Sequence, residues 1–434
     1  MNRNPKKAVH SAARRPVHPA QATASSEQSG RLNVLASWLT PAVALVAYLA
    51  FWPVPVTPQA WTPEKNLGYV GPHAPNHKLS GLQQLALASG QEGPEFIIAH
   101  AGVLYTGLLN GDVLKVNTDG QSHEVVVNTG GRPLGLDVDG QGRLLVADAM
   151  RGLLRISGRG PDAQIETLLT TVSHPVKNDP VRYADAVKVG PGGVLWLSDA
   201  TRRFGAKDVG STFEASVLDV LEHSCTGRII RQDPGTLAAS VALTGLCFPN
   251  GIEFSGDGKT MYISETGTYR ILAVDLAKLG AVRPSEGDTG VPTLADAMKQ
   301  GAVGIFADNL PGFPDNLTRS QSGRIWVGLT KPRSPVIDSM AGYPFVRAIT
   351  LRLPRFLWPV PKAYGHVIAY DENGKVVDDL QDPTGVYPET TAATEADGKL
   401  FIQSLHAHSI GWMPYNGPQV PRAEAESYLE GILN

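Results

Sequence analysis

The sequence predicts an all-β protein, namely a six-bladed β-propeller preceded by a single N-terminal transmembrane helix. Three observations lead to this prediction: a composition rich in turn-forming residues, a strand–turn unit that recurs six times, and an uncharged apolar stretch near the start of the chain. The 434 residues include 46 Gly and 33 Pro, and 42% of them are hydrophobic. So much Gly and Pro favours many turns, and the apolar content excludes wholesale disorder.

The predicted transmembrane helix covers residues 34–52, none of which is charged. These 19 residues would span about 28 Å as a helix, close to the hydrocarbon core of about 30 Å. Trp38 and Trp52 lie where interfacial anchors are expected. Residues 1–33 carry six Lys or Arg and one acid. The positive-inside rule therefore predicts a basic cytoplasmic tail, with the rest of the chain on the external (periplasmic, lumenal or extracellular) side.

A cleaved signal peptide and a core helix of a soluble protein are the alternatives for this stretch. The apolar run is long for a signal peptide, and Trp52-Pro53-Val54-Pro55 follows it instead of a small-residue cleavage site. An uncleaved signal anchor is therefore favoured. The Pro-rich residues 53–90 then read as a stiff stalk.

The repeated unit begins after the stalk, within residues 91–434. Each copy is a Gly-containing turn, then a short apolar strand, often ending in a small polar or acidic residue, and further strands flank several copies. The turn glycines are Gly102, Gly142, Gly193, Gly258, Gly323 and Gly398. Units of about 40 or more residues fit the four-stranded blades of a propeller. A long β-sandwich is the alternative, but it would not repeat one turn six times.

Charge and cysteine content exclude several classes of protein. Lys and Arg number 38 against 41 Asp and Glu, a net charge of -3, which argues against nucleic-acid binding. The two cysteines, Cys225 and Cys247, cannot form a disulfide scaffold or a four-thiolate zinc site. A disulfide between them and a pair of buried free thiols remain equally open.

Oxygen-bearing side chains stand at the predicted starts of the first strands in four units. These residues are Glu95, Asp185, Asn250 and Asp315. Because the first strands of propeller blades surround one channel, the four side chains should meet there. Buried carboxylates repel one another unless a cation lies between them, and oxygen ligands suit Ca²⁺ or Mg²⁺ better than Zn²⁺. Each motif alone is more readily a simple turn; four at equivalent positions favour the metal site.

Three of these motifs resemble those of the strictosidine synthase-like propellers, a family with signal-anchored, single-pass members. They are Asp185-Ala186-Val187, Phe248-Pro249-Asn250-Gly251 and the stretch 311–316, Pro-Gly-Phe-Pro-Asp-Asn. Related six-bladed hydrolases, the paraoxonases and gluconolactonases, hold calcium in the channel. The resemblance implies Glu95, Asn250 and Asp315 as ligands, with Asn316 adjacent. Asp185 departs from the family pattern, in which Asn is usual, but an Asp still suits a hard cation.

Two departures from the family narrow the expected chemistry. Where alkaloid-forming members place a catalytic Glu, this chain has Thr391, which cannot shuttle protons, and Glu389 is a poor substitute. No strictosidine synthase activity is therefore expected. The second-blade His of paraoxonase-like members is absent from Arg132-Pro133-Leu134-Gly135. His406 and His408, after the second strand of the sixth unit, are the candidate bases, along with Asp315.

An apolar insertion at residues 331–365 follows the second strand of the fifth unit. Its apolar spacing suggests an amphipathic helix that acts as a lid over the channel mouth, or that touches a membrane. The expected activity is Ca²⁺-dependent, arylesterase- or lactonase-like hydrolysis of small apolar esters or lactones, with Mg²⁺ as the alternative ion. The alternative function is a non-catalytic, membrane-anchored propeller that binds a protein or lipid partner. The sequence does not determine the oligomeric state.

Overall fold

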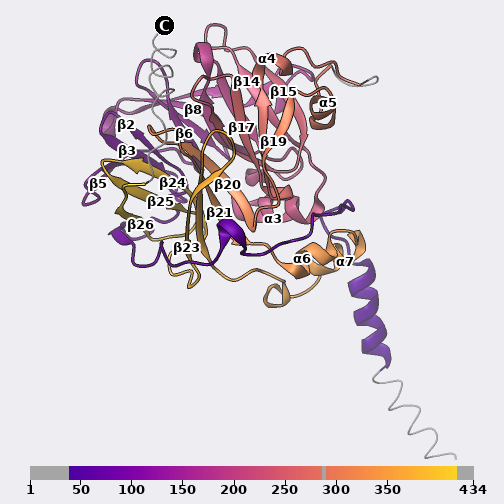
Figure 1. Ribbon diagram of the computed structural model, residues 1–434. Helices are drawn as coiled ribbons and strands as arrows, with labels where there is room; N and C mark the ends of the chain where they lie inside the picture. The colour runs from indigo at the N-terminus through magenta and orange to yellow at the C-terminus, as the bar shows by residue number, and fades with distance from the viewer. Residues whose placement is uncertain (1–38, 286–289, 418–434) are drawn as a thin grey trace, which may run out of the picture.

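The computed structural model describes residues 39–285 and 290–417, and they form an all-β body (Figure 1). In these residues the strands make six four-stranded sheets and one two-stranded sheet, all antiparallel. The predicted all-β class is therefore confirmed.

Five of the four-stranded sheets consist of consecutive strands. The first contains β2 (Ile97–His100), β3 (Val103–Gly107), β4 (Asp112–Asn117) and β5 (His123–Asn128). The second contains β6 (Pro133–Val138), β7 (Leu144–Asp148), β8 (Gly152–Ser157) and β9 (Gln164–Leu169). The third contains β12 (Ala184–Val189), β13 (Leu195–Asp199), β14 (Gly227–Gln232) and β15 (Ala239–Leu246). The fourth contains β16 (Pro249–Phe254), β17 (Thr260–Glu265), β18 (Arg270–Asp275) and β19 (Val303–Ala307). The fifth contains β20 (Gly312–Arg319), β21 (Ile325–Pro332), β22 (Gly365–Tyr370) and β23 (Val376–Asp382).

The sixth sheet joins the two ends of the body. It contains β24 (Thr390–Ala396), β25 (Lys399–Ser404), β26 (Ser409–Pro414) and, beside β26, the N-terminal strand β1 (Gln83–Ala86). The small two-stranded sheet is formed by β10 (Thr171–Val172) and β11 (Asp179–Pro180).

The first strands of the six sheets follow one another around a closed ring. In turn β2 contacts β6, β6 contacts β12, β12 contacts β16, β16 contacts β20, β20 contacts β24, and β24 contacts β2. The predicted glycine turns join the first and second strands of these sheets, since Gly102 precedes β3 and Gly398 precedes β25. Residues that start different sheets are thereby brought to one centre.

A β-bulge interrupts the start of five of these first strands. The pairing shifts register between Pro133 and Leu136, Ala184 and Val187, Pro249 and Ile252, Pro314 and Leu317, and Thr390 and Ala393. A bulge releases one or two residues from the ladder and re-aims their side chains. Asp185, Asn250, Asp315 and Asn316 all lie inside these bulges.

Close approach between neighbouring first strands explains a glycine within the fourth bulge. A Cβ on Gly251 would lie 2.3 Å from the backbone nitrogen of Leu317, on the next sheet. Ser264, on β17, supports the same bulge, because its hydroxyl accepts a 2.8 Å hydrogen bond from the Gly251 amide. The bulge is therefore held from its own sheet and packed against the next one.

The acidic residues that end several repeat units bind the backbone leading into the first strand. Asp148 accepts a hydrogen bond from the amide of Arg132, and Asp199 accepts one from the amide of Tyr183. Glu265 accepts one from the amide of Cys247. These carboxylates satisfy amides that the interrupted ladder leaves without a strand partner.

Residues 53–90, predicted to be a stiff stalk, lie against the folded body instead. Besides supplying β1, this segment runs along the body: the amide of Gln59 donates to the carbonyl of Glu222, and the amide of Leu79 to that of Gln381. It includes the short helix η1 (Gly71–His73). The predicted start of the folded domain at residue 91 is also wrong, because β1 completes the sixth sheet.

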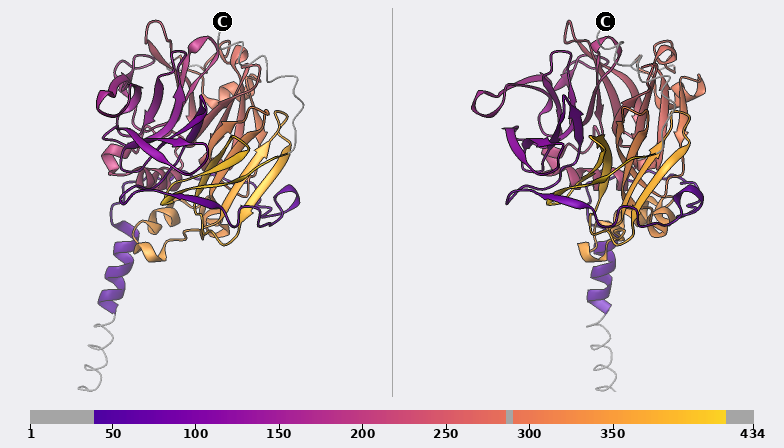
Figure 2. Two further views of the ribbon diagram at one scale, coloured as in Figure 1. Left: turned by 90° about the vertical axis from the view of Figure 1, so that its left-hand side faces the viewer. Right: turned by 60° about the vertical axis from the view of Figure 1, so that its left-hand side comes forward.

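A helix over residues 39–51 projects from the body in all three views (Figures 1 and 2). Its last turn is held by Arg352, which donates hydrogen bonds to the carbonyls of Leu49 and Trp52. Across residues 39–285 and 290–417, we find no helix with the length and apolar character needed to cross a membrane. The predicted transmembrane helix at 34–52 is thus not supported; its first residues, and the tail 1–33, lie outside the described residues.

Helical insertions lie in two of the sheets, and short helices occupy other connections. Between β13 and β14 lie α2 (Ala206–Val209) and α3 (Thr212–Glu222). Between β21 and β22, within the predicted lid 331–365, lie α6 (Pro335–Met340), α7 (Pro344–Thr350) and η5 (Arg355–Leu357). The others are η2 (Gly160–Asp162), η3 (Pro191–Gly193), η4 (Thr266–Thr268), α4 (Leu276–Leu279) and α5 (Leu294–Lys299). Since α7 packs against α3, the two insertions are in contact, near the helix 39–51 (Figure 1).

Candidate metal centre

The predicted ligand residues all lie at the starts of first strands and are buried. Their exposed fractions are 2% for Glu95, 1% for Asp185, 4% for Asn250, 5% for Asp315 and 0% for Asn316. Glu95 precedes β2, and the others lie on β12, β16 and β20. The closed ring of first strands brings these strand starts together, and no single sequence motif could specify that arrangement.

Direct contacts join residues that are far apart in the sequence. Nδ2 of Asn316 donates a 2.7 Å hydrogen bond to Oε1 of Glu95, and the hydroxyl of Thr391 donates a 2.5 Å bond to the Glu95 carbonyl. Asp315, the residue before Asn316, is also close enough to Glu95 for the charge of Glu95 to raise its pKa. The first, fifth and sixth sheets therefore meet around Glu95.

Five buried oxygen atoms of this cluster have no hydrogen-bond partner among the described residues. They are Oε2 of Glu95, Oδ2 of Asp185, and the Oδ1 atoms of Asn250, Asp315 and Asn316. Buried polar atoms are nearly always paired, because an unpaired one loses its hydration without compensation. Each of the five predicted ligand residues contributes one such oxygen, so the donor set fits a hard divalent cation.

The pKa shifts of the three carboxyl groups in the cluster also favour a bound cation. Burial raises the pKa of Asp185 well above its usual range, and the charge of Glu95 raises it further. Burial, Glu95 and Asp185 likewise raise the pKa of Asp315. The pKa of Glu95 is also raised by burial, although Arg132 and Asn316 act to lower it. Three carboxylates that destabilise one another's charge are what a bound cation would relieve.

Arg132, which was not among the predicted site residues, lies beside this cluster. It is 1% exposed, and its NH1 donates a 3.2 Å hydrogen bond to the carbonyl of Gly93. Burial lowers its pKa, and the charge of Glu95 acts to raise it. With every group ionised, three carboxylates and one guanidinium carry a formal charge of about −2, which a divalent cation balances. Arg132 stands directly before β6, as Tyr183 does before β12, and no local pattern marks it as part of the cluster.

The two candidate histidines behave differently. Nδ1 of His406 is hydrogen-bonded to Oε2 of Glu389, whose other oxygen lies 2.6 Å from Nζ of Lys331. Burial alone would raise the pKa of Glu389, but the bonds from His406 and Lys331 lower it to about 2. His408, with 78% of its side chain exposed, lies 3.5 Å from Glu92. Only His406 therefore has an orienting carboxylate within hydrogen-bond distance.

Neither histidine contacts the oxygen cluster directly, but His406 lies near its end of the ring. Leu405, the residue before His406, has its carbonyl oxygen packed against Gly93, two residues from Glu95. Glu389 stands two residues before Thr391, which contacts Glu95. The ring of His406 also meets Phe213 of α3 edge-on, at 5.8 Å between centroids.

Comparison with known proteins identifies the family. A profile of the SMP-30/Gluconolactonase/LRE-like region matches residues 91–337, which is more than half of the chain. The chain belongs to this family. It is 30% identical to Protein STRICTOSIDINE SYNTHASE-LIKE 13 of Arabidopsis thaliana, over 81% of this chain and 83% of that protein. It is 27% identical to the adipocyte plasma membrane-associated protein of Salmo salar, over 78% of this chain and 79% of that protein. The strictosidine synthase-like resemblance is thus confirmed.

The fold comparison agrees with this family. A solved gluconolactonase structure from Xanthomonas campestris superposes with a TM-score of 0.50 at 18% identity, covering 83% of this chain and 98% of the gluconolactonase. At this identity the likeness concerns the fold alone, which is of the propeller kind.

In this family member, an apolar cluster lies beside the oxygen cluster. Tyr183 and Phe248 directly precede β12 and β16, and they pack with Leu134, α2, α3 and Val56 of the N-terminal segment. Burial raises the pKa of Tyr183, and Asp185, Glu95 and Asp315 raise it further. The Tyr183 hydroxyl donates a 3.3 Å hydrogen bond to the carbonyl of Thr212 in α3. Leu351, from the insertion 331–365, packs at the edge of this cluster.

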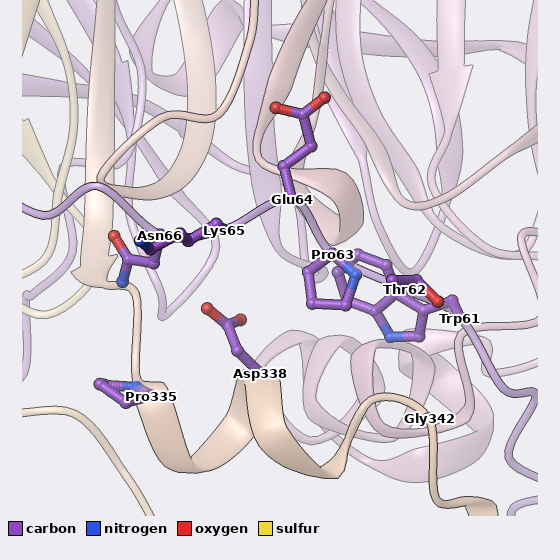
Figure 3. A pocket seen from close by; sticks show the side chains of 9 residues that line it. All are labelled: Trp61, Thr62, Pro63, Glu64, Lys65, Asn66, Pro335, Asp338 and Gly342. Carbon is purple, nitrogen blue, oxygen red and sulfur yellow. The ribbon is translucent and has the colours of Figure 1, made fainter.

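A separate groove of about 420 Å³ lies between residues 61–66 and α6 (Figure 3). Asp338 points into it in Figure 3, and its carboxylate is bound by Arg333 and Tyr269. None of the five candidate ligand residues lines this groove. The groove and the candidate metal centre are therefore different places on the molecule.

Proposed function

We propose that this protein is a six-bladed β-propeller that hydrolyses small apolar esters or lactones and depends on calcium, with magnesium as the alternative ion. The observation that carries the proposal is the set of five unpartnered, buried oxygens at the starts of four first strands. Glu95, Asp185, Asn250, Asp315 and Asn316 would hold the ion. When bound, a hard divalent cation polarises a substrate carbonyl, stabilises the oxyanion formed on attack, and makes water more acidic.

The chain itself would supply the positioning and the proton transfers. Asn316 holds one oxygen of Glu95 by its 2.7 Å bond, so Oε2 is left to face the ion. Asp315, whose pKa is raised by burial and by two neighbouring acids, can accept a proton from the attacking water. His406, oriented by Glu389, can deliver a proton to the leaving alkoxide near the mouth.

The family supports this reaction class, since its profile is named for gluconolactonase and a related fold is that of a gluconolactonase. The apolar surroundings formed by Tyr183, Phe248 and Leu351 favour an apolar substrate over a sugar acid. Thr391 is engaged with the Glu95 carbonyl and offers no proton shuttle, which supports the absence of strictosidine synthase activity.

The test is turnover of a panel of aryl esters and lactones by the whole chain, with calcium, with magnesium, and after treatment with a chelator. We expect hydrolysis that is lost with the chelator and restored by calcium. Turnover that persists in the chelator would overturn the metal-dependent mechanism.

A second candidate is a non-catalytic propeller that holds a structural ion and binds a partner. The burial of the five candidate ligand residues, none of which is more than 5% exposed, favours it, because a substrate would have to displace packed side chains to reach them. Calcium binding without turnover across the panel would support this candidate.

We further propose that the body resides in an oxidising compartment. Cys225 and Cys247 form a disulfide that joins the backbone before β14 to that before β16. Disulfides persist in secretory, periplasmic and extracellular proteins.

A further inference from the structure

Two histidines and an aspartate meet at a second place, on the fifth sheet. Oδ2 of Asp379 lies 2.8 Å from Nδ1 of His73 and 2.9 Å from Nε2 of His366. One potential ligand atom from each residue lies within 4.8 Å of the other two. His366 belongs to β22, Asp379 to β23 and His73 to η1, so three separate elements contribute.

The donor set differs from that of the channel cluster. Two imidazole nitrogens and one carboxylate oxygen suit Zn²⁺ and similar first-row divalent ions, whereas oxygen-only sets suit Ca²⁺. With ligand bonds of about 2.0–2.2 Å, neighbouring ligand atoms around such an ion lie about 3–3.5 Å apart. The two nitrogen–oxygen separations, 2.8 and 2.9 Å, therefore need to widen by only a few tenths of an ångström.

Surrounding contacts hold the carboxylate in position. Oδ1 of Asp379 accepts hydrogen bonds from the side chains of Gln381 and Asn76, so Oδ2 is left to face the imidazoles. His366 contacts Oδ2 through Nε2, and its Nδ1 has no hydrogen-bond partner among the described residues. A carboxylate whose second oxygen is held by hydrogen bonds, as in Asp379, is typical of metal sites.

Access to the cluster comes from the N-terminal segment. His366 is 1% exposed and Asp379 is 5% exposed, whereas the His73 side chain is 18% exposed. An ion could reach the cluster past His73, and water could complete its coordination. Because His73 belongs to the segment that precedes β1, ion binding would tie this segment to the sheet.

We propose that His73, His366 and Asp379 form a second metal site, which takes Zn²⁺ or a similar first-row divalent ion. The proposal is independent of the proposed hydrolase function, since no residue is shared with the candidate calcium centre. A hydrogen-bonded triad without metal affinity is the competing explanation.

The experiment is a competition titration of Zn²⁺ against a chromophoric chelator, using the whole chain in excess Ca²⁺ so that the oxygen cluster is supplied with its preferred ion. We compare the native chain with His73→Ala and with His77→Ala, a control on the same segment that is exposed. We expect His73→Ala to weaken the tightest Zn²⁺ site by about tenfold or more, and His77→Ala to leave it unchanged.

A second variant is needed because His73→Ala could weaken Zn²⁺ binding merely by disturbing the N-terminal segment that precedes β1. Asp379→Asn preserves the size of the side chain and should weaken Zn²⁺ binding to a similar degree, while circular dichroism reports whether the fold is intact. Zn²⁺ should also raise the melting temperature of the native chain more than that of either ligand variant. Equal Zn²⁺ affinity in the native, His73→Ala and Asp379→Asn chains would overturn the proposal.

Discussion

The side-chain amide of Asn316 donates a 2.7 Å hydrogen bond to Oε1 of Glu95, although 221 residues separate the two in sequence. Asn316 lies in the bulge of β20 and Glu95 just before β2, so the bond connects the fifth sheet to the first. It fixes the carboxylate while leaving Oε2, and the amide oxygen of Asn316, without partners among the described residues. The candidate metal centre is thus held in place by one of its own members.

The first prediction concerns Asp315→Asn. Removing one carboxylate should weaken Ca²⁺ binding by about tenfold or more, measured by isothermal titration calorimetry. The same change removes repulsion with Glu95 and Asp185, so the calcium-free variant should have a higher free energy of unfolding than the native chain at neutral pH. Asp162→Asn, at an exposed position, is the matched control. Unchanged Ca²⁺ affinity in Asp315→Asn would exclude this residue as a ligand.

The second prediction concerns pH. The pKa values of Glu95, Asp185 and Asp315 are raised in the folded state. The folded chain therefore binds more protons than the unfolded one, and stability from these groups is lost as pH rises above the usual carboxyl pKa of about 4. Calcium should compensate, so the gain in melting temperature on adding Ca²⁺ should be small near about pH 5 and larger near about pH 8. A gain independent of pH would contradict this assignment.

The third prediction separates the two histidines. His406→Gln should lower kcat for an ester or lactone substrate by about 10²-fold or more, since a positioned acid or base contributes that much. Glu389→Gln should lower kcat in the same direction, because Glu389 orients His406. His408→Gln is the control, and its side chain is largely exposed. Ca²⁺ affinity should be unchanged in all three; equal kcat in His406→Gln and His408→Gln would remove His406 from the mechanism.

The fourth prediction concerns packing between first strands. Gly251→Ala places a Cβ 2.3 Å from the backbone nitrogen of Leu317, and it should lower the free energy of unfolding by about 2–3 kcal/mol. Gly235→Ala, where a Cβ meets nothing within 4 Å, should change it by less than about 0.5 kcal/mol. Urea denaturation of both variants provides the measurement. Equal stabilities would show that the sheets are less closely packed here than the structure indicates.

The fifth prediction concerns the N-terminal segment. A chain that begins at residue 91 lacks β1, which leaves β26 as an unpaired edge, whereas a chain that begins at residue 53 keeps the complete sixth sheet. The shorter chain should melt at a lower temperature and aggregate more readily, as followed by circular dichroism and light scattering. Equal melting temperatures would mean that β1 contributes nothing to stability.

The sixfold repeat could be read from the sequence because its signal is local. Gly102 and Gly398 occupy tight turns with positive φ, and each is followed within a few residues by an apolar strand. The ligand positions were predictable for the same reason, since Asn250 and Asp315 stand at fixed places relative to strands that the pattern identifies.

Other features depend on contacts that no local pattern records. The predicted stalk fails because hydrogen bonding to β26 places residues 83–86 in the sixth sheet, and a Pro-rich segment carries no sign of a partner more than 300 residues away. Arg132 was overlooked as a member of the metal centre because its role arises from burial beside Glu95.

By itself, then, the sequence determined the all-β class, the repeating unit and the residue types at the head of each first strand, since turn chemistry and strand periodicity act over a few neighbouring residues. Only the tertiary structure decided that Glu95 meets Asn316, that β1 closes the sixth sheet, and that His73 joins His366 at Asp379. These relationships arise when the ring closes, because closure brings together residues that the chain alone keeps hundreds of positions apart.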